Sequence, residues 1–244
     1  MRVFEPAVPD WCQDDLCVTT VGFAVSPCPA RGLGFVEPMS NPFESQDSFE
    51  DQVFEGLSLE HADLSDRVFD RCTFRSSKLG ETRWWRSRLD ECVFEGCDIV
   101  RADVKMLALR GVRFKACRLM GVDFADIAKF PDVSFHECNL HYASFATLAL
   151  RKTVFERCSF TEANFFETDL TEAKLDDCQF TGARFEACDL RKARFLRAEN
   201  LFIDPTKNRV AGAKVPLETA VLLATSFGMR VLDFQSERDD DGTK

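Results

Sequence analysis

The sequence has little tyrosine and histidine for its length, and it lacks a long apolar run. Its 244 residues include 24 phenylalanines but a single tyrosine, Tyr142, and three histidines. A chain this rich in phenylalanine and poor in tyrosine favours a core in which a phenolic hydroxyl would find no hydrogen-bond partner. Because no run of about eighteen apolar residues occurs, the sequence predicts no membrane-spanning helix.

Motifs that carry catalysis or metal binding are also missing. The sequence contains no glycine-rich phosphate loop and no Cys-x-x-Cys pair. The three histidines, His61, His136 and His141, have no evident nucleophile at a catalytic spacing. We therefore expect a non-enzymatic protein without a metal site or cofactor.

A five-residue period dominates the chain. A large apolar residue recurs at every fifth position from Phe49 to Phe124, and after one extra residue the period resumes at Phe130 and runs to Phe195. A small side chain stands two positions before most of these large residues. Neither the helical period of 3.6 nor the strand period of 2.0 produces this pattern, so it indicates a repeat architecture.

A chain that turns a corner every five residues closes a square coil of about twenty residues, and successive coils would hydrogen-bond at roughly 4.8 Å. Large and small residues at the periodic positions point inward, and the charged residues between them face solvent. The period thus predicts an all-β solenoid over residues 44–200. We expect the extra residue near 125–130 to kink the coil or change its direction without interrupting the interior.

The cysteines follow the same period. Eight of the eleven fall on the small inward position: Cys72, Cys92, Cys97, Cys117, Cys138, Cys158, Cys178 and Cys188. Neighbouring coils would bring some of them close enough for a disulfide. Packing as small, reduced thiols is favoured, because the period already explains their placement. Reduced thiols indicate a cytoplasmic protein. The acidic residues Asp14 and Asp15 before the apolar stretch 16–25 also argue against an export signal.

The two ends of the chain lack the period. Residues 1–43 are rich in proline and are expected to form a poorly ordered extension. Met39 is a candidate for the natural start, because the residues after it lead directly into the first coil. At the other end, we expect residues 201–234 to form a turn, helix and strand, and residues 235–244 to form a disordered charged tail.

The C-terminal segment predicts an amphipathic helix. Pro216 suits a helix start, Gly228 suits a helix end, and residues 229–234 suit a short strand. The apolar stripe comprises Leu217, Ala220, Val221, Ala224 and Phe227, broadened by Leu222 and Leu223. Such a helix could cover the open end of the last coil or pair with a second copy across a twofold axis.

Several units match the A(D/N)LXX consensus of the pentapeptide-repeat family. The best matches are Ala62-Asp63-Leu64, Ala102-Asp103-Val104, Ala163-Asn164-Phe165, Ala183-Arg184-Phe185 and Cys188-Asp189-Leu190. The chain resembles this family over about 150 residues. The resemblance implies a right-handed quadrilateral β-helix with a C-terminal capping or dimerisation helix and a short strand.

The end of the repeat resembles one branch of that family. The segment reads IDPTKNRVAGAKVPLETAVLLATSFGMRV. It is similar to the albicidin-, microcin- and quinolone-resistance (Qnr) proteins, although the long loops of some Qnr members are absent. The resemblance implies a head-to-head homodimer with an interface of Leu217, Val221, Leu222, Leu223, Phe227, Met229 and Val231. It also implies a DNA-like acidic surface that binds DNA gyrase or topoisomerase IV and protects the enzyme from a poison.

Charge bears on this expectation, because mimicry of DNA needs carboxylates at phosphate-like density. The net charge is −10, and it is −8 over residues 44–70, +6 over 71–118 and −7 over 119–190. The candidate acidic stripe facing a topoisomerase consists of Glu137, Glu156, Asp176 and Asp177.

A basic belt interrupts the acidic surface. It comprises Arg83, Arg86, Arg88, Arg101, Lys105, Arg110, Arg113, Lys115 and Arg118, and Arg83, Trp85, Arg86 and Arg88 form a candidate contact site within it. The belt could contact DNA held by an enzyme or another acidic partner, and no sequence-specific nucleic-acid binding is expected. The alternative function is a scaffolding module that presents a flat side to an unrelated protein.

Overall fold

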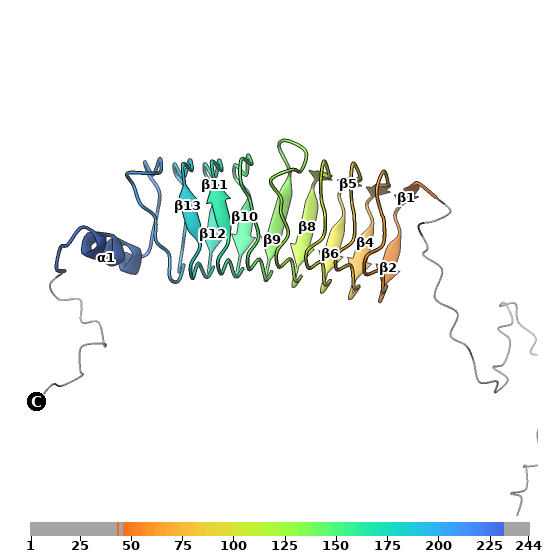
Figure 1. Cartoon of the computed structure of the whole chain (residues 1–244), viewed down its shortest axis with the longest axis horizontal. Coiled ribbons are helices and arrows are strands. Elements are labelled where there is room, and N and C mark those ends of the chain that lie inside the picture. The colour runs from red at the N-terminus through yellow and green to blue at the C-terminus, as the bar shows by residue number, and fades with distance from the viewer. Residues whose placement is uncertain (1–42, 44–45, 232–244) are drawn as a thin grey trace, which may run out of the picture. The chain divides into compact units, whose positions relative to one another are not determined.

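The computed structural model describes Phe43 and residues 46–231, which form a four-sided β-solenoid of about seven turns followed by one helix (Figure 1). The expected all-β fold is confirmed. The strands are β1 (Ser48–Glu50), β2 (Val53–Glu55), β3 (Val68–Asp70), β4 (Thr73–Arg75), β5 (Arg88–Asp90), β6 (Val93–Glu95), β7 (Ala108–Arg110), β8 (Val112–Lys115), β9 (Val133–His136), β10 (Val154–Glu156), β11 (Asn164–Phe166), β12 (Lys174–Asp176) and β13 (Arg184–Glu186). The poorly ordered extension expected over 1–43 lies outside the described residues except for Phe43, which is buried in the core and so does not belong to it; Met39 as the start and the 235–244 tail also lie outside the described residues.

Every strand pairs in parallel with a strand one coil away. On the first side, Phe49 stands opposite Phe69 in a sheet of order β1-β3-β5-β7. The second side forms a sheet of order β2-β4-β6-β8-β9-β10-β12. Single bridges such as Ser58 to Lys78 join the third side, and β11 pairs with β13 on the fourth. The twenty-residue offset seen in the sequence is therefore the register of the coils.

Aromatic rings stack along the interior. On the second side, ring centroids are 4.6 Å apart for Phe74 and Phe94, 5.0 Å for Phe94 and Phe114, 5.2 Å for Phe114 and Phe135, and 5.1 Å for Phe135 and Phe155. The planes of neighbouring rings are nearly parallel, because each ring lies on its counterpart at the coil spacing. All the predicted large inward residues except Phe130 are buried.

The small inward residues satisfy backbone carbonyls. The Sγ of Cys92 lies 3.4 Å from the carbonyl oxygen of Phe69, and that of Cys97 lies 3.4 Å from the carbonyl oxygen of Phe74. Burial raises the pKa of the Cys92 thiol to about 12, which keeps it protonated and able to donate. All eight described cysteines are buried and free, and one column contains Cys97, Cys117, Cys138, Cys158 and Cys178.

Most corners of the coil place a residue in the left-handed region of φ. Asp51, Arg71 and Glu91 occupy one column of corners with φ of 52°, 50° and 51°. This conformation costs free energy for a residue other than glycine. Each amide at these corners donates to a carbonyl of the next coil, as from Arg71 to Asp90 (2.9 Å) and from Glu91 to Arg110 (2.7 Å). These hydrogen bonds between coils offset the local cost.

Trp84 occupies an inward position that leucine or phenylalanine fills in most coils. Its indole Nε1–H donates to the hydroxyl of Thr82 at 2.8 Å, and that hydroxyl donates to the carbonyl of Leu79 at 2.6 Å. The small-position threonine therefore supplies the acceptor that a buried indole requires.

Phe43 covers the interior at the start of the solenoid. It is fully buried, and its ring packs edge-on against Phe49 (5.1 Å), Phe54 (4.9 Å) and Phe69 (5.5 Å). Phe43 thus contributes to shielding the first rings of the stack from water.

The extra residue forms a loop that projects beside β9 (Figure 1). The amide of Ala128 donates to Leu107, whereas the amide of Asp132 donates to Leu109, so the loop lies between them. The prediction that Phe130 points inward is wrong: it lies in this loop with 78% of its surface exposed. The interior remains continuous, as expected, because Phe114 still stacks on Phe135 across the insertion.

Helix α1 (Leu217–Ser226) follows the last coil, with Pro216 as its N-cap. Gly228 has a φ of 78°, and the amides of Gly228 and Met229 donate to the carbonyls of Thr225 and Ala224, which terminates the helix as predicted. Residues 229–231 form no strand, so this part of the expected strand is wrong, and 232–234 lie outside the described residues.

Truncating a ring in the stack should destabilise the solenoid. We expect Phe155→Ala to lower the free energy of unfolding by about 3–5 kcal/mol, because a large cavity would remain in a buried stack. The control is Phe130→Ala at the exposed loop residue, which should change stability by no more than about 0.5 kcal/mol. Denaturant unfolding of both variants measures the difference, and equal losses would contradict the assignment of the core.

Candidate functional site

Charged residues form columns along the outer surface, and in several of these columns acids and bases alternate, although like charges are neighbours in others, as Asp70 and Asp90 are. Glu55, Arg75, Glu95 and Lys115 occupy one register position in successive coils. Glu95 lies 2.8 Å from the amine of Lys115 and 3.5 Å from the guanidinium of Arg75. The hydrogen bond from Lys115 lowers the pKa of Glu95. Each exposed pair stabilises the fold little, but together they neutralise much of the surface.

The predicted acidic stripe lies on neighbouring coils, but bases are interleaved with it. Glu137 and Glu156 share the guanidinium of Arg157, at 2.9 Å and 2.7 Å respectively. Glu156 also lies 3.3 Å from the imidazole of His136. This half of the stripe is therefore not a bare row of carboxylates.

The other half of the stripe is paired in the same way. Asp176 stands opposite Glu156 in the β10–β12 register and forms an ion pair with Arg194. Asp177 forms an ion pair with Arg197, whose hydrogen bond lowers the pKa of Asp177. All four carboxylates thus have a basic partner, usually one coil away.

The basic belt is compensated as well. Arg86 lies 2.6 Å from Asp66, and Arg118 lies 2.9 Å from Asp98. The belt residues with an acidic partner are Arg83, Arg86, Arg88, Arg101, Lys105, Arg110, Lys115 and Arg118. Within the described part of the chain, Arg113 is the one member of the belt that forms no ion pair.

Trp85 forms the aromatic centre of the predicted contact site. The guanidinium of Arg83 lies 4.8 Å from the centre of the indole, and the amine of Lys105 lies 5.3 Å away, both within range of a cation–π interaction. Trp85, Arg86, Lys105, Met106 and Asp126 line a hollow of about 270 Å³. Arg88 belongs to β5 on the first side and pairs with Asp90 instead, so it does not line this hollow.

Several carboxylates without a basic partner lie along the fourth side of the later coils. Asp123 shares a column with Ser144 and Asn164, which are uncharged. Among the described residues, no ion pair involves Asp123, Asp126, Glu162 or Glu167. Phe166 of β11 is partly exposed next to Glu167. The charge pattern of the sequence did not reveal this patch, because paired and unpaired carboxylates look alike in a count.

The structure brings a serine to one histidine. The Nε2 of His141 lies 2.7 Å from the Oγ of Ser159, which is also 3.4 Å from the amide oxygen of Gln179. Sequence analysis missed the pair because eighteen residues, almost one coil, separate the two. Within the described residues no hydrogen bond involves the Nδ1 of His141, so the pair lacks the third group that orients a catalytic histidine.

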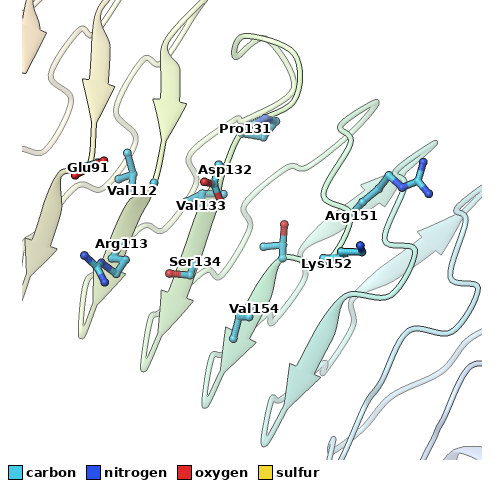
Figure 2. Close-up of a pocket in the computed structure, with 12 residues that line it drawn as sticks. Glu91, Val112, Arg113, Pro131, Asp132, Val133, Ser134, Arg151, Lys152 and Val154 are labelled. Carbon is cyan, nitrogen blue, oxygen red and sulfur yellow. The ribbon is translucent and has the colours of Figure 1, made fainter. Parts of the chain in front are cut away.

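A groove of about 580 Å³ lies beside the inserted loop (Figure 2). It crosses the corner between the first and second sides, where β8, β9 and β10 begin. Its polar lining comprises Glu91, Arg113, Asp132, Ser134, Arg151, Lys152 and Thr153. Figure 2 shows Arg113 at one end and Arg151 and Lys152 at the other, with Ser134 between them.

Two further kinds of site are absent within residues 46–231 and Phe43. No three side chains of histidine, cysteine, aspartate or glutamate come together in a way that would hold a metal ion. The helix in this range is too short to cross a bilayer.

The family comparison identifies the repeat. A model of the pentapeptide repeat region matches residues 67–145 and 128–201. The chain is a pentapeptide-repeat protein. Two trypsin-treated variants of QnrB1, a plasmid-mediated fluoroquinolone resistance protein, share the fold with a TM-score of 0.60. At 19% and 18% identity, each match covers 76% of this chain and 99% or 97% of the QnrB1 chain. No curated protein matches the sequence.

The pentapeptide-repeat surface should lose stability in acid. The pKa of Asp177 is lowered by Arg197, that of Asp51 by Arg71 and that of Asp66 by Arg86. Because these folded-state values lie below the unfolded value of about 3.9, their contribution is complete above that pH and is lost as the pH falls through the folded values. Thermal unfolding should therefore occur at lower temperature at pH 3 than at pH 7.

A pair of variants isolates this effect. Asp177→Asn should weaken the pH dependence, whereas Glu167→Gln should leave it unchanged, because no ion pair of Glu167 exists among the described residues. Both positions have a positive φ, 55° and 53°, so their backbone conformations are matched. The same pH dependence in Asp177→Asn and the parent protein would contradict the assignment.

Proposed function

We propose that the protein binds a type II topoisomerase, DNA gyrase or topoisomerase IV, and protects it from a poison without catalysing a reaction. The fold likeness to QnrB1, a fluoroquinolone resistance protein, is the observation that carries the proposal. The net charge of −10 agrees with a surface directed at an enzyme that binds DNA. In this proposal the protein acts in the reducing cytoplasm, which suits its free thiols.

The unpaired carboxylates of the fourth side are the part of the surface best suited to replace DNA phosphates. Asp123, Asp126, Glu162 and Glu167 can accept hydrogen bonds from an anion-binding surface without first breaking an ion pair. Glu137, Glu156, Asp176 and Asp177, the stripe expected from sequence, would have to give up arginine partners. We therefore propose the fourth side as the principal contact and the stripe as a secondary one.

A scaffolding role is the second candidate. The extensive pairing of acids with bases favours it, because a neutralised surface resembles DNA less than a bare acidic one does. In that case Trp85 and its neighbouring cations would contact a different protein partner.

Supercoiling by purified gyrase, with and without a fluoroquinolone, separates the two candidates. We expect the protein to restore supercoiling in the presence of the drug. Replacing Asp126 and Glu167 with Asn and Gln should reduce this protection about tenfold or more, because charge-assisted hydrogen bonds would be lost. The control replaces Glu156 and Asp177 with Gln and Asn and should lose less. No effect of the parent protein on gyrase or topoisomerase IV would favour the scaffold.

We also propose that two copies associate through α1. The helix and the residues directly after it leave apolar side chains exposed, including Leu217 (73%), Phe227 (57%) and Met229 (56%). The proposed interface comprises Leu217, Val221, Leu222, Leu223, Phe227, Met229 and Val231. Such a surface on a short terminal helix is typical of an interface, and a twofold pairing would remove it from water.

Charged substitutions test this interface. Replacing Leu223 and Phe227 with Asp should produce monomers in sedimentation and abolish protection of gyrase. Val53→Asp is the control, because Val53 is also apolar and 59% exposed but belongs to β2, away from α1 and from the candidate contacts. A helix variant that sediments as a dimer would show that the interface lies elsewhere.

A further inference from the structure

The groove of Figure 2 owes its shape to the inserted residue. The corner column that carries Glu91 and Lys152 has no side chain at Gly111, and the inserted loop carries Phe130 outward in the coil between. Gly111 has a φ of 63°, and a Cβ there would lie 3.5 Å from the side chain of Glu91. The hollow of about 580 Å³ therefore follows from two local departures from the repeat.

None of the three cations of the groove forms a close ion pair with a described residue. Arg113 forms no ion pair with any described residue. Arg151 lies 3.7 Å from Asp169 and Lys152 lies 3.9 Å from Glu172, both too far for a direct hydrogen bond. Most paired arginines outside the groove lie closer to their acidic partner, as Arg86 does to Asp66 at 2.6 Å, and Arg110 at 3.9 Å from Asp90 is an exception. Three basic groups with unsatisfied donors thus line one hollow.

The rest of the polar lining of the groove consists of two hydroxyl groups and two carboxylates. Ser134 lies between the two basic ends in Figure 2, and Thr153 contributes a second hydroxyl. Glu91 and Asp132 also line the groove, which leaves the lining with a single excess positive charge. An anion would therefore be attracted to the basic ends and repelled by Asp132.

We propose that this groove binds the phosphate group of a nucleotide or of a nucleic-acid backbone. A planar guanidinium can donate two parallel hydrogen bonds to phosphate oxygens, and a lysine amine and hydroxyl groups add further donors. The volume accommodates more than an isolated phosphate, so a base or sugar fits beside it. This site does not depend on the proposed binding of a topoisomerase.

Calorimetric titration of the full chain tests the proposal with three probes: inorganic phosphate, adenosine monophosphate and a short DNA duplex. We expect binding of at least one probe at millimolar concentration or tighter, weakened about tenfold by Arg113→Gln through loss of charge-assisted hydrogen bonds. Arg184→Gln is the matched control, because Arg184 is another coil arginine without an ion pair among the described residues but lies on β13, away from the groove. Binding of the monophosphate identifies a free nucleotide as the source, and binding of duplex alone identifies the nucleic-acid backbone.

A variant that is expected to bind more tightly distinguishes the loss of a contact from misfolding, because a misfolded protein would lose affinity. Asp132→Asn removes one of the two negative charges that line the groove and should tighten binding several-fold. The proposal is overturned if none of the three probes binds, if Arg113→Gln and Arg184→Gln weaken binding equally, or if Asp132→Asn leaves affinity unchanged or lowers it.

Discussion

The whole structure depends on the stacking of each coil on the next at a single spacing. Ring centroids 5.1 Å apart, as in Phe135 and Phe155, match the distance at which parallel backbones exchange hydrogen bonds. The same interval sets the contact between a thiol and the carbonyl of the previous coil, as in Cys92 and Phe69. It also sets the reach of surface ion pairs such as Arg197 with Asp177. The stacking of interior rings, the hydrogen bonding of the backbone and the pairing of surface charges therefore all depend on the spacing between one twenty-residue coil and the next.

The interior was predictable from the sequence because the five-residue period directly identifies the residues that face inward and stack on successive coils. The burial of Phe94 and the termination of α1 at Gly228 follow from spacing and local propensity. The sequence predicts Phe130 to be buried because the five-residue period locates an insertion only to within one repeat. The backbone hydrogen bonds of Ala128 and Asp132 instead determine which residues leave the coil. The pairing of Arg197 with Asp177 was visible in the twenty-residue spacing, but a count of acids by segment discarded that information.

The candidate sites were less predictable, because they arise where columns meet or where the repeat departs from its pattern. The groove beside the insertion requires Gly111, the looped-out segment and Arg113 to be placed together in space. The approach of His141 to Ser159 depends on an interval that is two residues short of a coil. The chain is a pentapeptide-repeat protein with a QnrB1-like fold, while its possible partners depend on these local surfaces.

The alternation of charge along a column such as Glu55, Arg75, Glu95 and Lys115 disfavours an error to which repetitive chains are prone. If one entire coil were looped out, the packing of the interior would change little, because Phe54 would stack on Phe94 in place of Phe74. On the outer surface, by contrast, Glu55 would face Glu95, and the repulsion between these like charges would destabilise the new pairing of coils. Alternating surface charges can thus disfavour the omission of a coil, which the similar residues of the interior would tolerate.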